Sequence, residues 1–432
     1  MRFAALRARW YKGYLTGGSL GMTGDHVEHA ITYYVMWQLF HSPLLAGFAV
    51  ISHWLPHLLF GVFFGSLADR FDNRRIVQAA QSLFILASLS WGIFIALGAL
   101  QPWICVLLLL IHGFASALWG PADQMMLYDI VGEKDLPSAV RLMATGMNLG
   151  QFIGPLVGAA LLFTVGPAIA MFVNVVFFLP FIIYLWIVPF DGHERRGAAT
   201  GVRLGLRAMF GVLAEIPRFP AILVIFVLQG AVGLLIGTTL LPLLPDFGEM
   251  LGASEGLGYS ALVTAMSLGA IVAGLALEGI GRVRAGTRLA IVSTGVFAAS
   301  LVVFAFSHNL VLSVAMLVLA GAGNLVSAST SQTVVQLGAP GDRRGRFLGA
   351  FSMVGTGLRV GSGVVVGLLG SLVGPAGAIA IDAGEVGADQ AAEQLDLDVA
   401  HDPVADPVDQ PRLGHLGDRP DEGADRDGER NG

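Results

Sequence analysis

The chain has 432 residues, of which 55% are hydrophobic and only 13% charged, and its mean hydropathy is +0.71. Soluble domains carry about 25% charged residues, so this composition excludes an ordinary soluble enzyme or nucleic-acid-binding protein and is typical of a membrane protein. The net charge of −6 is unevenly distributed, because residues 382–432 hold 15 acidic residues and four arginines, whereas residues 1–381 hold 16 acidic and 21 basic residues. The single Cys105 excludes an intramolecular disulfide and a cysteine-based metal cluster.

Eleven apolar segments follow one another along the chain. The first, 16–40, follows a basic N-terminus, but it contains two acidic residues and lacks a clear signal-peptidase site, so we interpret it as a retained helix. The others are 44–66, 76–98, 102–125, 142–164, 167–190, 219–244, 257–280, 287–306, 310–335 and 347–372. Each is long enough to cross a hydrocarbon core of ~30 Å as a helix that rises 1.5 Å per residue.

The basic residues of the connections predict the orientation of these helices. Twenty of them lie before the first segment or in every second connection after it, and the remaining connections contain no Lys or Arg. This partition follows the positive-inside rule, so we expect a multi-pass protein of the cell membrane with a cytoplasmic N-terminus.

A polar stretch between the second and third segments is the most specific motif: Gly65-Ser-Leu-Ala-Asp69-Arg70-Phe-Asp72-Asn-Arg74-Arg75. Its charges predict a tight cytoplasmic turn. The pattern resembles the loop between helices 2 and 3 of the major facilitator superfamily, a class of twelve-helix secondary transporters. The resemblance implies that Asp69 lies near the N-terminal end of a helix in the other half and near arginines of the loop, as a charge latch that closes the cytoplasmic side. The alternative is a solvated loop without a gating role.

The second half of the chain repeats this motif at an offset of 209 residues. The stretch Gly274-Leu-Ala-Leu-Glu278-Gly-Ile-Gly-Arg282-Val-Arg284 puts Glu278 where the first half has Asp69, which we interpret as a vestigial second latch. Parallel repeats of this kind are typical of the two halves of the major facilitator fold. We therefore expect an all-α membrane protein with two six-helix bundles. The expected organisation is an N-terminal half (1–190), a cytoplasmic linker (191–218), a C-terminal half (219–381) and an acidic disordered tail (382–432).

The fifth segment contains small residues at every fourth position. Gly150, Gly154 and Gly158, with Pro155 between them, resemble the motif of exporting members of the superfamily, although Arg141 stands where the family form has another glycine. Such a stripe flattens one helix face for close contact, and the proline kinks the helix. The alternative is ordinary packing of small residues.

Ionisable side chains inside the apolar segments are candidates for substrate binding or proton coupling. In the first segment Asp25, Glu28 and His29 share a helix side, and a carboxylate and an imidazole four residues apart can exchange protons near neutral pH. The alternative is that they lie hydrated near the cytoplasmic mouth. In the eleventh segment Arg359 is expected to face the cavity, paired with Asp25 or Glu28 or with an anionic substrate. A structural ion pair between the halves is the alternative.

The fourth segment lacks an arginine that many proton-coupled exporters have four residues before a glycine. Aligned on Gly113, this chain has Leu109 at that position and His112 next to the glycine. Any proton coupling therefore uses other groups, which makes His112 a residue to mutate. Nucleotide-binding, hydrolase and zinc-protease motifs are missing from the sequence, so we expect no enzyme activity, no cofactor and no metal.

The composition changes abruptly after Ile381, where a twelfth helix should begin. Residues 382–432 contain no Phe, Trp, Tyr, Ile or Lys, so we expect this polar tail not to span a membrane. One interpretation is a natural eleven-helix protein with an extracytoplasmic tail. The interpretation that we favour is a frameshift in a GC-rich gene that has replaced helix 12, which resequencing of the gene would test.

Further residues resemble the branch of the superfamily that contains enterobactin exporters and macrolide efflux proteins. They are Gly24-Asp25, Ser42-Pro43-Leu44, Leu67-Ala-Asp-Arg, Pro121, Gln336, Pro340 and Arg344-Gly-Arg346. This resemblance implies export of a small amphipathic molecule, of drug or siderophore type, by alternating access with proton antiport. An importer or facilitator of the same fold, a non-transporting membrane sensor and a truncated relic remain alternatives. The expected partners are a small-molecule substrate, protons and the lipid bilayer, without nucleic acid, and the chain is expected to be monomeric.

Overall fold

The computed structural model describes residues 2–193, 206–237, 244, 247–253, 256–281, 283–362, 383 and 386, which all belong to one compact unit that spans residues 1–390. Every regular element within these residues is a helix. Seven of the described helices are long and apolar enough to cross a membrane, or eight if a bent pair over residues 211–236 counts as one span. The prediction of an all-helical membrane protein is therefore confirmed.

The N-terminal half contains the first six predicted segments in five continuous helices. They are α1 (Tyr11–Phe40), α2 (Pro43–Arg70), α3 (Asn73–Ala96), α4 (Pro102–Val165) and α5 (Pro167–Ile187), after a short 3-10 helix η1 (Ala4–Arg7). Helix α4 holds two predicted segments and consists of two helical stretches that join at Gly132. The backbone leaves helical geometry there, with φ 75° and ψ 173°, a conformation that residues with a Cβ rarely adopt. We call residues 102–131 its first leg and residues 133–165 its second leg.

The C-terminal half contains the next five predicted segments. After α6 (Leu206–Glu215) and η2 (Ile216–Arg218), its elements are α7 (Pro220–Ala231), the π-helix η3 (Val232–Ile236), α9 (Gly256–Ile280), α10 (Thr287–Ala305), α11 (Leu310–Gly338), η4 (Gly341–Arg343), α12 (Arg344–Ser352) and the π-helix η5 (Met353–Gly357). Several predicted regions lie outside the described residues. They are parts of the seventh and eleventh segments, the position expected for a twelfth helix, and almost all of the acidic tail.

Two helix boundaries differ from the sequence-based ones in ways that matter for function. Helix α1 begins at Tyr11, five residues earlier than predicted, so its ionisable residues lie deeper in the helix. Helix α2 continues through Arg70, so the connection to α3 consists only of Phe71 and Asp72. The Asp72 side chain caps α3 by accepting a hydrogen bond from the backbone N–H of Arg74 at 2.9 Å, which satisfies one of its free N-terminal donors.

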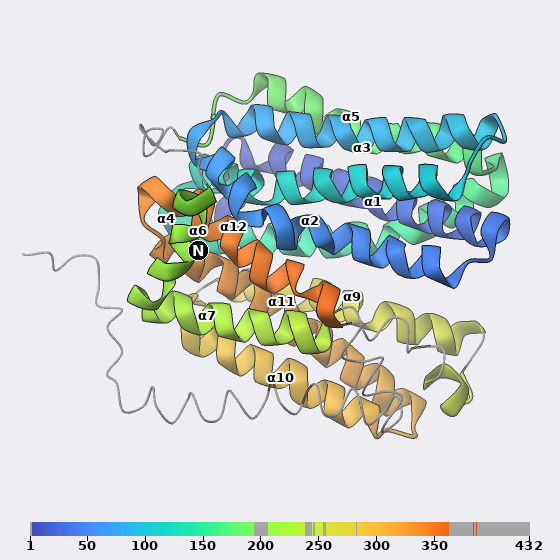
Figure 1. Ribbon diagram of the computed structural model, residues 1–432. Helices are drawn as coiled ribbons and strands as arrows, with labels where there is room; N and C mark the ends of the chain where they lie inside the picture. The colour runs from blue at the N-terminus through green and yellow to red at the C-terminus, as the bar shows by residue number, and fades with distance from the viewer. Residues whose placement is uncertain are drawn as a thin grey trace, which may run out of the picture. The chain divides into compact units, whose positions relative to one another are not determined.

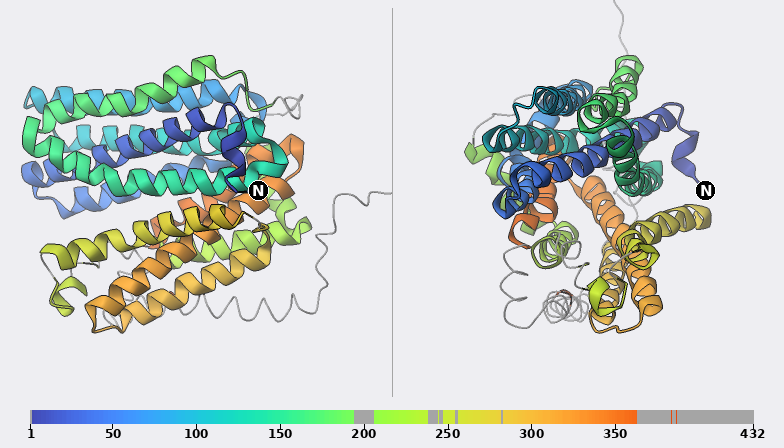
Figure 2. Two further views of the ribbon diagram at one scale, coloured as in Figure 1. Left: turned by 180° about the vertical axis from the view of Figure 1, so that it is seen from behind. Right: turned by 90° about the vertical axis from the view of Figure 1, so that its right-hand side faces the viewer.

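Figures 1 and 2 show α1–α5 gathered in one bundle and α7 and α9–α11 in a second, with α12 running beside α2. One end of these helices contains the N-terminus, the Phe71–Asp72 turn, Gly132 and η4, and there the backbone N–H of Ala5 donates a hydrogen bond to the hydroxyl of Ser138. The basic connections lie at this end, so we call it the arginine-rich end and expect it to face the cytoplasm. The largest hydrophobic core of the described residues lies here and draws side chains from both halves.

The two halves touch most extensively along two helix pairs that the internal repeat relates to each other, and α4 also contacts α11 and α12. The first pair is α2 with α12, which approach closely because glycines face glycines: a Cβ on Gly65 would lie 2.2 Å from the carbonyl oxygen of Gly345. The second pair is α9 with the second leg of α4, where a Cβ on Gly274 would lie 1.9 Å from Oγ1 of Thr145. Close backbone approach at small residues is how helices associate in membranes.

Candidate functional site

A histidine joins two buried carboxylates in the N-terminal half. Asp25 and Glu28 of α1 are 8% and 3% exposed, and His112 of the first leg of α4 is 3% exposed. The Nε2 atom of His112 lies 2.8 Å from Oδ1 of Asp25, and its Nδ1 atom lies 2.9 Å from Oε1 of Glu28. A buried carboxylate needs a partner of opposite charge or hydrogen bonds, and one imidazole contacts both carboxylates here.

The second oxygen of Glu28 is bound by neighbouring helices. The hydroxyl of Ser88 on α3 donates to Oε2 of Glu28, and the side-chain amide of Asn174 on α5 donates to that hydroxyl at 3.1 Å. The Glu28 carboxylate is therefore connected to three other helices of the half, which fixes its position in the bundle.

Further histidines surround Asp25. The Nδ1 atoms of His26 and His29 lie 3.2 and 3.5 Å from Oδ2 of Asp25. The ring of His53 on α2 lies 5.0 Å from that of His29 and 5.5 Å from that of His112, measured between ring centres. We call Asp25, His26, Glu28, His29, His53 and His112 the histidine–carboxylate cluster.

The cluster lies deep in its half. Asp25 is 14 residues from the start of α1 and 15 from its end, which places it near the middle of a helix about 45 Å long. This position and the burial of both carboxylates favour a place inside the half over the alternative that these groups are hydrated at the cytoplasmic mouth. The sequence predicted that Asp25, Glu28 and His29 share one side of the first helix. The structure adds His53 of α2 and His112 of α4 to this group, which the sequence did not indicate.

The glycine stripe of the fifth predicted segment brings α4 close to this part of α1. Gly150 faces the backbone of Ser19 and Thr23, and a Cβ on Gly154 would lie 2.4 Å from Cβ of His26. Gly158 faces Val27 and Ala30 one turn further on, whereas Pro155 is exposed on the other side of the helix. The stripe therefore packs against α1 around Asp25, and its role in export remains a prediction.

Arg359 lies apart from the two carboxylates that we expected to be its partners. Its guanidinium lies over the ring of Trp54 on α2, 5.0 Å from the ring centre, and its buried Nε atom has no hydrogen-bond partner. Among the described residues the ion pairs of Asp25 and Glu28 are formed with histidines alone. The expected pairing was wrong: His112 contacts both carboxylates, and Arg359 packs on Trp54.

Asp69 is 2% exposed and lies at the N-terminus of α12. Its carboxylate accepts hydrogen bonds from the backbone N–H groups of Gly345 and Arg346, the latter at 3.1 Å, and from Nε of Arg346 at 3.2 Å. The first N–H groups of a helix have no partner within it, and the positive end of the helix dipole favours an anion. Asp69 thus connects α2 of one half to α12 of the other.

The loop arginines make other contacts than the expected one with Asp69. Arg74 pairs with Asp72 at 2.9 Å, Arg75 donates to Gln78 at 3.1 Å, and Arg70 lies over the ring of Phe71. The arginine that reaches Asp69 comes from α12 instead. In the repeated motif Arg284 is exposed, and Arg282 lies outside the described residues.

Glu278 forms the corresponding contact of the second pair of helices. It is 1% exposed, accepts from Nε of Arg141 at 2.8 Å and from the hydroxyl of Ser138 at 2.6 Å. Both partners lie near the start of the second leg of α4, as Gly345 and Arg346 lie at the start of α12. This contact is a complete buried ion pair, so the interpretation as a vestige was wrong.

We expect Arg141 and Glu278 to be energetically coupled. Glu278→Gln and Arg141→Gln should each lower the free energy of unfolding, whereas the double variant should recover part of the loss, because removing one partner alone leaves a buried charge. A coupling energy of about 1–3 kcal/mol is expected from a double-mutant cycle. Thermal unfolding in detergent measures it. Strictly additive effects would show that the two charges do not depend on each other.

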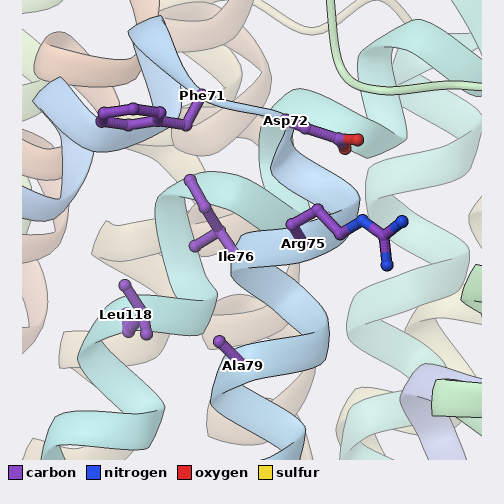
Figure 3. Close-up of a pocket in the computed structure, with 6 residues that line it drawn as sticks. All are labelled: Phe71, Asp72, Arg75, Ile76, Ala79 and Leu118. Carbon is purple, nitrogen blue, oxygen red and sulfur yellow. The ribbon is translucent and has the colours of Figure 1, made fainter.

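A shallow hollow of about 370 Å³ lies elsewhere, at the arginine-rich end (Figure 3). Its lining residues are Phe71, Asp72, Arg75, Ile76, Ala79 and Leu118. The side chains of Asp72 and Arg75 point to one side of it, away from the apolar residues. It contains no member of the histidine–carboxylate cluster, so we do not assign substrate binding to it.

Comparison with known proteins identifies the family. A family model described as "transmembrane secretion effector" matches residues 1–395. The chain belongs to this family of the major facilitator superfamily. This confirms the resemblance found in the sequence, and it makes the chain a multi-pass transporter of the cell membrane and not an enzyme.

Two relatives and one solved structure illustrate this membership. The enterobactin exporter EntS of Escherichia coli O127:H6 is 26% identical over 86% of each chain. The uncharacterized transporter YfiS of Bacillus subtilis strain 168 is 25% identical over 50% of this transporter, and the match spans only 53% of YfiS. The fucose:proton symporter FucP of E. coli superimposes with a TM-score of 0.70 at 13% identity, over 89% of this transporter and 98% of FucP, which shows the shared fold.

Several residues of the site were missed in the sequence. Ser88 and His53 lie in apolar segments, and no spacing connects them with Asp25 or Glu28. Ser138 had a usable signal: it lies 207 residues before Gly345, close to the offset of 209 residues at which the motif repeats. Arg141 was noted only as a departure from the export motif, although its position is explained by the ion pair with Glu278.

Proposed function

We propose that this transporter exports a small amphipathic molecule in exchange for protons, and that Asp25, His112 and Glu28 carry the protons. The observation that supports this most directly is the bridge that His112 forms between two buried carboxylates. Imidazole and carboxylate groups gain or lose a charge with one proton, and ionisable groups inside a membrane are typical of proton relays. A proton taken up by either carboxylate weakens the bridge and so alters the contact between α1 and α4.

The contacts between the halves supply the conformational part of the proposal. Asp69 and Glu278 join the halves at the arginine-rich end, and the pairs α2–α12 and α4–α9 pack closely there. The innermost polar contact of the first pair is His57 with Ser352 at 2.8 Å, one helical turn from His53. The cluster therefore lies beyond the closed contact, as expected for a state that is sealed toward the cytoplasm.

Proton entry from the outside would convert this state into the opposite one. Protonation of the cluster neutralises carboxylates, and reorientation of the halves would break the contacts of Asp69 and Glu278 with α12 and α4. The substrate would then bind from the cytoplasm and leave on return. Rocking of two halves around a site at mid-membrane is the general mechanism of this fold.

The substrate class rests on the relatives. EntS matches this transporter over 86% of both chains, which supports export of a bulky, partly apolar molecule such as a catecholate siderophore. An identity of 26% supports the class of substrate and not the compound. An importer of the same fold is the second candidate, and the direction of transport separates the two.

We expect energised inside-out vesicles that contain this transporter to accumulate iron-free enterobactin or the amphipathic dye Hoechst 33342, and an uncoupler to abolish the accumulation. Vesicles with the Asp25→Asn variant at equal abundance serve as the control, because they lack one proton carrier. Accumulation in right-side-out vesicles instead would assign an importer. Flux that is indifferent to the uncoupler would refute proton coupling.

A further inference from the structure

Three histidines from three helices converge in the N-terminal half. The ligand atoms of His29 on α1, His53 on α2 and His112 on α4 all lie within 4.8 Å of one another. The sequence did not indicate this group, because its members are 24 and 59 residues apart and show no metal-binding spacing. Imidazole nitrogen is the ligand that Zn²⁺, Ni²⁺, Cu²⁺ and Fe²⁺ favour in proteins.

Asp25 adds a carboxylate to the three imidazoles. It precedes His29 by four residues, so both side chains point to the same side of α1. Its two oxygens lie 2.8 Å from Nε2 of His112 and 3.5 Å from Nδ1 of His29. Oδ1 makes the first contact and Oδ2 the second, and each distance is within about 0.5 Å of the ~3.3 Å that separates the ligand atoms of a tetrahedral Zn²⁺ site with bonds of about 2.0–2.1 Å.

We propose that Asp25, His29, His53 and His112 bind one divalent transition-metal ion, with Zn²⁺ as the best match. The widest separation within the three histidines exceeds the tetrahedral value by about 1.5 Å, which rotation of an imidazole side chain covers. Three nitrogens and one oxygen make a closed tetrahedral set.

Two ring nitrogens of the set lack hydrogen bonds. Nδ1 of His53 and Nε2 of His112 are buried without a hydrogen-bond partner, since the contact of the latter with Asp25 has no hydrogen-bond alignment. A buried polar atom without a partner is unfavourable by about 1–3 kcal/mol. A metal ion between these nitrogens and the Asp25 carboxylate would satisfy both.

Residues around the set orient one of its ligands. Nδ1 of His112 contacts Glu28, whose other oxygen accepts a hydrogen bond from Ser88. A histidine that donates its second ring N–H to a carboxylate is typical of metal sites, because the contact fixes the tautomer and raises the basicity of the coordinating nitrogen. This contact leaves Nε2 of His112 as the coordinating atom.

The charge of the cluster also fits a divalent cation. Asp25 and Glu28 are buried, and in the part of the chain that the structure describes no Lys or Arg forms an ion pair with either. Neutral imidazoles and two carboxylates carry a charge of −2, which one M²⁺ ion offsets. The cluster is not sealed, because the side chains of His26 and His29 are 21% and 19% exposed, so an ion can reach it.

The test uses the full chain, purified in detergent with an affinity tag that contains no histidine. We expect one Co²⁺ per chain, with the visible absorption of four-coordinate cobalt, and its displacement by Zn²⁺. His29→Gln, His53→Gln and His112→Gln should each abolish the absorption, and Glu28→Gln should weaken Co²⁺ binding about 10–100-fold. His57→Gln, which also removes a buried histidine of α2, should bind Co²⁺ normally.

Melting curves keep the result interpretable for variants of lower stability. Zn²⁺ should raise the melting temperature of the wild type and of His57→Gln, and it should leave that of the three histidine variants unchanged. Co²⁺ binding that persists in all three variants, or a wild type that binds neither ion, would overturn the proposal. The site shares Asp25 and His112 with the proposed proton carriers, so a bound ion and a proton exclude each other there. Binding is measured without a proton gradient, so a failure of proton coupling would leave this result unaffected.

Discussion

Replacement of His112 by glutamine is expected to abolish uphill transport while exchange of substrate across the membrane continues. Glutamine keeps a similar length and can donate a hydrogen bond, but it cannot take up a proton or oppose the charges of Asp25 and Glu28. The two carboxylates would then lack the imidazole that joins them, so a proton taken up from one side could not pass between them. Loss of a positioned proton-transfer group typically costs about 10²–10⁴ in rate.

Two assays on the same proteoliposomes measure this effect. Uphill accumulation of enterobactin under an imposed pH gradient should fall at least about 100-fold, whereas counterflow of labelled against unlabelled substrate without a gradient should persist. His308→Gln is the control, because that histidine is exposed in the connection between α10 and α11. Uphill transport that survives in His112→Gln would exclude this histidine as a proton carrier. Loss of counterflow as well would indicate a structural role.

Replacement of Gly65 by valine is expected to open the arginine-rich end. A Cβ at this position would lie 2.2 Å from the carbonyl oxygen of Gly345 and 3.0 Å from Cα of Arg346, so the backbones of α2 and α12 must move apart. That movement would also break the hydrogen bonds of Asp69 with α12. A penalty of about 1–3 kcal/mol on the closed state alone shifts the population of the two states about 5- to 150-fold.

Spin labels at two exposed residues of this end, introduced as Arg70→Cys and Asp342→Cys in a Cys105→Ala background, report the separation of the halves. We expect Gly65→Val to move the distance distribution to longer values and to reduce transport in the same proportion. Gly279→Val is the matched control, because it places valine in a helix where a Cβ would meet no atom within 4 Å. An unchanged distribution in Gly65→Val would contradict the inferred role of the glycine contact.

The repeat within the chain explains why the closed end has two similar contacts. Asp69 binds the start of α12, and Glu278 binds the start of the second leg of α4 through Arg141. The chemistry differs: each carboxylate contacts an arginine side chain, but Asp69 also accepts from two backbone N–H groups at a helix N-terminus, whereas Glu278 also accepts from the hydroxyl of Ser138. Removal of either carboxylate therefore affects a different pair of helices, and both pairs must separate when the halves rock.

The sequence by itself determined the helices, the family and the two halves. A run of about 20 apolar residues can satisfy its backbone in a membrane only as a helix, so composition alone locates the spans. The motif around Asp69 and its copy around Glu278 identified the repeat, because each is contiguous in the chain. It also singled out Asp25, Glu28, His29 and His112 individually, since a charge or imidazole in an apolar segment requires an explanation.

Only the tertiary structure decided which of these groups meet. His112, on the first leg of α4, lies between Asp25 and Glu28 of α1, whereas Arg359 lies over Trp54 of α2. The approach of helices from distant parts of the chain depends on the shape of whole helix faces, which no local spacing records. For that reason the partners of Asp69 and Glu278 and the group of three histidines could be found only in the folded chain.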